Sequence, residues 1–256
     1  MVINTLCYIF VFLRIIIAIK TKYMKHYRLI KNYFVSLISL IIMLSAFALN
    51  AQQVTFNDTW KKQGLHIEKQ DKQSLKLSFS VNSYERMALD VNGRQMEKIN
   101  MQGSLLQNSE GNPDLPVISR YVAIPQGAEV KVSVNNKRTA SLNNINISPA
   151  PRIPWDTDRG PLEYKKNNEI YSKDAFFPSQ NVIVSEPTTI RGLDVVLISI
   201  SPFQYNPVTK EMLISRDMDI EIEFVGGNGH FGEDKYRNRF WDPILFDMVF
   251  NNDVVD

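Results

Sequence analysis

The sequence predicts an all-β fold, an antiparallel β-sandwich or barrel-like domain, and three observations lead to this prediction. Apolar and polar residues alternate along several short segments, which is typical of strands with one buried face. A further segment is more continuously apolar, which indicates a central strand. Turn-forming residues separate these segments, as they do in sandwiches and barrels. The alternating segments are Ser74–Val81, Glu129–Asn135 and Asp219–Phe224, the apolar one is Leu193–Ile200, and the turns are Gly111–Pro113, Pro125–Gly127 and Tyr205–Lys210.

Helical periodicity is strong only near the C-terminus, where a short helix is expected. The Asp242–Pro243 pair suits a helix start, since proline is favoured at the first helical position. Phe246, Val249 and Phe250 would then share one face. Two alternatives remain open: the helix packs back on the β core, or it belongs to a following domain.

The N-terminus contains two apolar runs, Val2–Ile19 and Tyr33–Leu49, with a basic stretch between them. The second run has the anatomy of a signal peptide, and Met24 is the expected start of translation. Small residues allow cleavage after Ala48 or after Ala51. The alternative is a pair of membrane helices, because the first run has nearly the length needed to span a bilayer.

The expected organisation has four parts. Residues 1–51 form the N-terminal hydrophobic extension and signal peptide, and residues 52–73 form a loosely ordered lead-in. Residues 74–225 form the β-rich domain. Residues 226–256 form a flexible glycine linker and a C-terminal segment.

Composition excludes several kinds of function. Lys and Arg number 29 against 27 Asp and Glu, so no strong field favours nucleic acid. Cys7 is the only cysteine and lies in the N-terminal apolar run, which excludes a disulfide framework and a cysteine nucleophile in the exported part. No metal, cofactor or stable small-molecule ligand is expected, because His66 and His230 alone do not form a ligand pattern.

The glycine-rich stretch Gly227–Gly232 matches the spacing of a dinucleotide fingerprint. Acidic residues follow it directly where phosphates would bind, and too little chain remains for a βαβ unit. No nucleophile elbow is present, and a Ser-His-Asp triad has only two histidines to draw on. No catalytic residues are therefore expected in this chain.

A proline-rich stretch, Pro149–Trp155, cannot be an interior strand because proline removes backbone donors. An extended, surface-lying segment is expected there. It serves either as a crossover between two sheets or as a recognition loop that presents Arg152 or Arg159 to a partner.

Four motifs, taken together, resemble those of gingipain-type propeptides of the C25 cysteine peptidases. The resemblance runs from about Ser74 to Phe224. The motifs stand in this sequence as Glu110–Ala128 (EGNPDLPVISRYVAIPQGA), Ile170–Pro178 (IYSKDAFFP), Ile190–Gly192 (IRG) and Pro202–Glu211 (PFQYNPVTKE).

The resemblance implies a β-sandwich-like prodomain that follows a signal peptide and precedes a catalytic domain, which it helps to fold and holds inactive. Its partner would be a C25 catalytic domain, in cis or from a neighbouring product, and the parent protein a cysteine endopeptidase. Relatives include a surface sortase of type IX secretion, which implies export machinery as a further partner. The location would be periplasmic, on the outer-membrane surface or extracellular. The catalytic domain would be missing here, so the chain is a truncated gene product or a free-standing domain.

The resemblance also gives roles to single residues. Arg152 and Arg159 become candidates for an inhibitory loop that offers a basic side chain to the protease. Arg237 and Arg239 become candidates for activation cleavage. The main alternative function is a carbohydrate-binding or adhesive β-sandwich, in which Trp155 and Tyr164 would stack on sugars. A stand-alone enzyme is the third alternative.

Overall fold

The computed structural model describes residues 51–106, 109–233, 235 and 238–255. The expected signal peptide, cleavage position Ala48 and activation candidate Arg237 lie outside the described residues. Among those residues, no helix has the length and apolar character needed to cross a bilayer.

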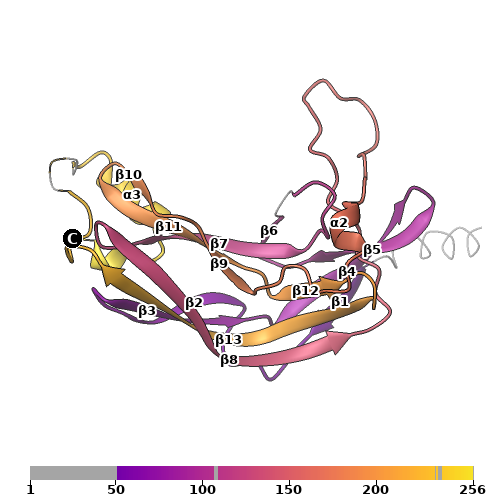
Figure 1. Cartoon of the computed structure of the whole chain (residues 1–256), viewed down its shortest axis with the longest axis horizontal. Coiled ribbons are helices and arrows are strands. Elements are labelled where there is room, and N and C mark those ends of the chain that lie inside the picture. Colours follow the sequence, from indigo (N-terminus) through magenta and orange to yellow (C-terminus); the bar gives the residue numbers. More distant parts are fainter. Residues whose placement is uncertain (1–50, 107–108, 234, 236–237, 256) are drawn as a thin grey trace, which may run out of the picture. The chain divides into compact units, whose positions relative to one another are not determined.

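Three antiparallel sheets make up the described part of the chain, and two of them form the layers of a sandwich (Figure 1). The first layer has the order β12-β13-β3-β2, with β8 paired to β13. Its strands are β2 (Gly64–Gln70), β3 (Ser74–Ser80), β8 (Ala128–Leu142), β12 (Phe203–Asn206) and β13 (Glu211–Gly226).

The second layer has the order β10-β11-β7-β6, with β9 also paired to β11. Its strands are β6 (Leu105–Leu106), β7 (Pro116–Ala123), β9 (Val182–Val184), β10 (Thr188–Ile190) and β11 (Leu193–Ile200). The third, smaller sheet has the order β1-β4-β5. It contains β1 (Ala51–Thr55), β4 (Ser83–Val91) and β5 (Arg94–Asn100).

Alternating apolar side chains of the two layers build one core. Leu75, Leu77 and Phe79 of β3 are fully buried, as the period-two pattern predicted. β11 spans Leu193–Ile200 and lies between β7 on one edge and β9 and β10 on the other, so the prediction of a central strand is confirmed. These residues join a single cluster with those of β7 and β13. The all-β sandwich prediction is therefore confirmed.

The expected loosely ordered lead-in, residues 52–73, is corrected by the structure. This region contains β1 and β2, and the connection between them is fastened to the first layer. The carboxylate of Asp217 is fully buried and accepts hydrogen bonds from the Trp60 amide (2.8 Å), the Ser80 hydroxyl (2.7 Å) and Arg138 Nε (2.9 Å). A buried charge requires such donors, and Trp60 supplies one from this connection.

The C-terminal segment packs back on the β core, which is the first of the two alternatives given above. Helix α3 spans Asp242–Met248, with proline in its first turn, and is followed by the short 3-10 helix η2 (Asn252–Val254). Leu245 and Val255 are buried. The helix ends before Val249, which is extended, so Val249 and Phe250 do not continue its face as expected.

The expected flexible glycine linker is also corrected between residues 226 and 232. Gly227 has φ +78° and packs so closely on the 126–128 turn that a Cβ would lie 2.9 Å from the Gln126 carbonyl oxygen. The Gln126 amide donates to the His230 carbonyl at 2.9 Å, and Phe231 is buried. The glycines thus serve a close, ordered contact of two backbones.

Candidate functional site

The long connection between β8 and the short helix α2 (Asn168–Tyr171) projects beyond the sheets (Figure 1). We call residues 151–166 of this connection the projecting loop. It contains Pro151–Trp155 of the predicted proline-rich stretch and has no helix or strand. Residues 153–155 are exposed as expected, but Pro149 and Ala150 are buried and Pro149 forms an antiparallel bridge with Pro113, so only the later part of the stretch lies at the surface. The loop also connects β8 of the first layer to β9 of the second, so it lies on a crossover between the two sheets.

The base of the projecting loop is closed by the first family-like motif. The Gly111 amide donates to the Ala150 carbonyl at 3.0 Å, and the Asn167 amide donates to the Gly111 carbonyl at 2.8 Å. The Ala150 amide donates in turn to the Asn112 carbonyl at 2.7 Å. Both ends of the loop are therefore held by one turn, about 40 residues upstream in the chain.

Gly111 is required at this turn for two reasons. Its φ of +82° lies in the left-handed region, which side chains disfavour. A Cβ here would lie 2.7 Å from the Lys165 carbonyl oxygen, closer than atoms can approach. Since the backbone of the loop's end occupies the space of a side chain, the glycine of this motif is what allows the loop to close.

Arg152 is fastened inside the projecting loop. Its Nη2 lies 2.7 Å from Asp158 Oδ2 and its Nε lies 3.2 Å from Glu163 Oε2. Its backbone amide donates to the Glu163 carbonyl at 2.9 Å. The Trp155 amide, followed by the Arg152 guanidinium, lowers the pKa of the Asp158 carboxyl. Arg152 therefore links the two arms of the loop.

Arg159 lies at the exposed far end of the same loop. Within the described residues its side chain has neither a hydrogen bond nor an ion pair, and the flanking residues Asp158 and Gly160 are exposed. The loop also exposes large apolar side chains, with Ile153 at 61% and Trp155 at 75% of their full accessible area. The two predicted arginines therefore lie in one loop but in different environments.

The remaining sequence-predicted residues do not gather at the projecting loop. Ala51 is the first residue of β1, paired with Met87 of β4. Arg239 is exposed just before α3, with its guanidinium 4.8 Å from the ring centre of Phe240. In the described part of the chain, no group of three His, Cys, Asp or Glu side chains is placed to hold a metal ion.

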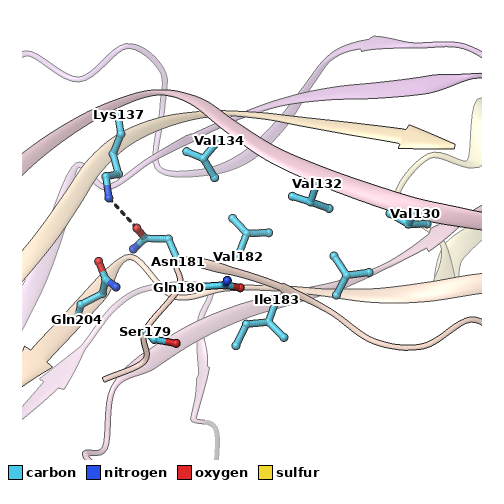
Figure 2. Close-up of a pocket in the computed structure, with 11 residues that line it drawn as sticks. Val130, Val132, Val134, Lys137, Ser179, Gln180, Asn181, Val182, Ile183 and Gln204 are labelled. Atoms are coloured by element: carbon cyan, nitrogen blue, oxygen red, sulfur yellow. Dashed lines mark hydrogen bonds between the residues drawn. The ribbon is translucent and has the colours of Figure 1, made fainter. Parts of the chain in front are cut away.

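A groove of about 600 Å³ lies elsewhere, between β8 and residues 179–184, which include β9 (Figure 2). Val130, Val132 and Val134 of β8 line one side, and Lys137 Nζ donates to Asn181 Oδ1 at 3.0 Å across it. None of its lining residues is aromatic, so this groove offers no stacking platform for a sugar.

The family model Propeptide_C25 matches residues 62–235, which is more than half of the chain. The chain belongs to this propeptide family. Lys-gingipain HG66 of Porphyromonas gingivalis is 23% identical to this propeptide over 185 residues, which cover 69% of the chain and 11% of that relative. Gingipain R1 of the same organism is 27% identical over 146 residues, which cover 52% of the chain and 14% of that relative. The propeptide thus spans only a small part of the length of the curated relatives it matches.

Two solved structures have the same fold. One is described as the complex of Porphyromonas gingivalis RgpB pro- and mature domains, with a TM-score of 0.65 and 18% identity; it covers 75% of this chain and 100% of the matched chain. The other is described as structural insight into zymogenic latency of gingipain K from Porphyromonas gingivalis, with a TM-score of 0.58 and 19% identity; it covers 69% of this chain and 100% of the matched chain. At these identities the structures support the fold of this propeptide.

Sequence reasoning identified the projecting loop and its two arginines but missed how the loop is held. The Gly111 turn was recognised as a turn, yet its contact with residues 165–167 is visible only in three dimensions. The usable signal was the group of three prolines within six residues, Pro149, Pro151 and Pro154, which excludes an interior strand.

Proposed function

We propose that this chain is the prodomain of an exported C25-type cysteine peptidase, which it inhibits and helps to fold. Membership of the propeptide family supports this proposal, as do the matched structures described as pro- and mature-domain complex and as zymogenic latency. The cysteine nucleophile would belong to the catalytic domain, in cis or from a neighbouring product. The carbohydrate-binding alternative is not favoured.

The projecting loop is the proposed inhibitory element, and the difference between its two arginines carries this assignment. Arg152 makes ion pairs to Asp158 and Glu163 and so shapes the loop. Arg159 keeps its guanidinium exposed. A planar guanidinium suits a protease pocket that offers a carboxylate, because the two groups can form paired hydrogen bonds. Arg159 is therefore the residue proposed to enter the active site.

The apolar side chains of the loop give the same partner more contact area. Ile153, Trp155 and Leu162 are all exposed, and such residues around a basic anchor are typical of protein interfaces. The prolines and the closed base limit the freedom of the free loop. Less conformational entropy is then lost on binding.

Export and processing complete the proposal. The location is periplasmic, outer-membrane surface or extracellular, with the type IX system as export machinery. Removal of a signal peptide after Ala48 leaves β1 whole, whereas cleavage after Ala51 removes its first residue. Arg239 is exposed and is an activation-cleavage candidate, as is Arg237, which lies outside the described residues.

Inhibition can be measured directly. The chain is titrated against the mature catalytic domain of a C25 peptidase such as gingipain R1, and hydrolysis of an arginyl substrate is followed. The proposal expects stoichiometric loss of activity. Full activity at a large excess of the chain, together with binding on a glycan array, would instead favour the carbohydrate-binding alternative.

A further inference from the structure

The last residues of the chain occupy an edge of β7. β11 pairs with residues 118–123 of β7 on one side. On the opposite side, Val249 forms a parallel bridge with Tyr121, and the Phe250 amide donates to the Tyr121 carbonyl at 2.8 Å. The chain therefore adds to β7 in the way a bound strand adds to a sheet edge.

Asn251 extends this pairing with its side chain. Its Oδ1 accepts from the Ala123 amide at 2.8 Å, and its Nδ2 donates to the Ala123 carbonyl at 2.9 Å. Asn251 is only 1% exposed. One side-chain amide thus satisfies both backbone groups of Ala123, and leaving one of them unpaired in a buried position costs about 1–3 kcal/mol.

Apolar contacts accompany these hydrogen bonds. Val249 and Val255 belong to the core cluster, and Leu245 is the buried residue of α3. The Gln70 side chain of β2 donates to Asp253 Oδ2 at 2.9 Å. We refer to residues 245–255, held by these contacts, as the C-terminal clasp.

The polypeptide just before the clasp is exposed. Lys235, Arg239 and Phe240 all lie at the surface, and Phe240 is 70% exposed. Hydrolysis of the Arg239–Phe240 bond by a protease would consume one water and leave a carboxylate on Arg239 and an ammonium group on Phe240. Both new charges would face solvent, so the cut would not disturb the buried contacts of residues 245–255.

We propose that the C-terminal clasp keeps the two products of such a cut together. Scission near Arg239 then nicks the chain without separating residues 240–256 from the β domain. Any polypeptide that continues past Asp256 then stays tethered to the β domain. Under the proposed function, on which this consequence rests, that polypeptide is the catalytic domain. Tethering keeps the inhibitory loop at a high effective concentration.

The test uses the full chain with a recognition sequence for a sequence-specific viral protease inserted after Arg239. After complete cutting, size-exclusion chromatography and mass spectrometry determine whether residues 240–256 elute with the β domain. We expect co-elution at micromolar concentration. Immediate separation of the wild-type segment would overturn the clasp.

Two variants provide the matched comparison. Asn251→Asp retains shape but loses the donor to the Ala123 carbonyl, so the segment should dissociate at least about tenfold faster. Asn252→Ala removes an exposed amide that donates to the Phe246 carbonyl at 3.2 Å, and retention should persist. Equal retention in Asn251→Asp and wild type would contradict the role of Asn251.

A competition keeps the test decisive if Asn251→Asp does not fold. Excess synthetic peptide 240–256 should displace the cut wild-type segment, and the same peptide with Asn251→Asp should not. Equal displacement by both would again contradict the proposal. Neither readout involves peptidase inhibition, so the two proposals can fail separately. If the C-terminal clasp holds but the chain inhibits no peptidase, only the proposed function is refuted.

Discussion

The side-chain amide of Asn206 donates a hydrogen bond to the Asp174 carboxylate, with 2.7 Å between Nδ2 and Oδ1. Beside it, Phe177 and Tyr205 exchange two backbone hydrogen bonds of 2.9 and 2.8 Å. These four residues come from two motifs that are separate in the sequence and resemble the gingipain-type pattern. The structure joins them into one unit at the turn between β12 and β13.

Asn206→Ala should destabilise the fold by about 1–2 kcal/mol. Besides its bond to Asp174, Asn206 Oδ1 accepts from the Val208 amide at 3.0 Å, and the residue is buried. Denaturant unfolding measures the loss. Asn135→Ala, which removes an exposed amide bonded to Glu221, is the control and should stay within about 0.5 kcal/mol of wild type. Equal unfolding midpoints for the two variants would contradict this role of Asn206.

Gly111→Ala should cost more than about 2 kcal/mol and loosen the projecting loop, because its Cβ would collide with the Lys165 carbonyl oxygen. Gly103→Ala is the matched control. Gly103 has φ +78°, similar to the +82° of Gly111, but open space where a Cβ would lie. Gly103→Ala should lower the free energy of unfolding by only about 1 kcal/mol, which is the cost of a left-handed backbone for a residue with a side chain. Thermal unfolding compares the two, and an equal shift would show that the close contact is unimportant.

Asp114→Asn should stabilise the protein at pH 7 by about 1 kcal/mol. Burial raises the pKa of the Asp114 carboxyl, and Lys98 Nζ, 3.6 Å away, opposes this only in part. A raised pKa in the folded state means that ionisation penalises folding. The penalty is absent below the ordinary value of 3.8 and grows as pH rises above it.

Denaturant unfolding at pH 7 and at pH 4 checks the sign. The advantage of Asp114→Asn should shrink as pH falls towards 4. A variant that is less stable at pH 7 than wild type would indicate that the ion pair with Lys98 outweighs burial.

Arg152→Ala should weaken inhibition by about tenfold while leaving the fold intact. The substitution removes the ion pairs that join the two arms of the loop, so the loop must be ordered at the moment of binding. Limited proteolysis should cut the loop of this variant faster. Unchanged proteolysis together with unchanged inhibition would show that Arg152 does not shape the loop.

The strands of this propeptide could be predicted from short segments, because apolar and polar residues alternate along a strand that has one buried face. β11 begins and ends at the predicted residues, Leu193 and Ile200. The hairpin at Tyr205–Lys210 was likewise recognisable, since Asn206 and Pro207 are turn residues.

Contacts between distant residues escaped prediction. Arg138 and Asp217 are 79 positions apart, and no local pattern marks them as partners. Both side chains also bond to the connection between β1 and β2, since Asp217 accepts from the Trp60 amide and Arg138 donates to the Asp58 carbonyl. The sequence of that connection is mainly polar and does not indicate these bonds. Asn251 offered one weak signal, a polar residue directly after an apolar run, but its partner Ala123 is 128 positions away.

The inhibition constants of Arg159→Ala and Arg120→Ala test the central claim most directly. Arg120 is also exposed but belongs to β7 and not to the projecting loop. Measured against a C25 catalytic domain, Arg159→Ala should raise the inhibition constant about 100-fold, or about 2.7 kcal/mol, and Arg120→Ala should leave it unchanged. Equal inhibition by Arg159→Ala and wild type would contradict the proposal that this loop delivers Arg159 to the active site.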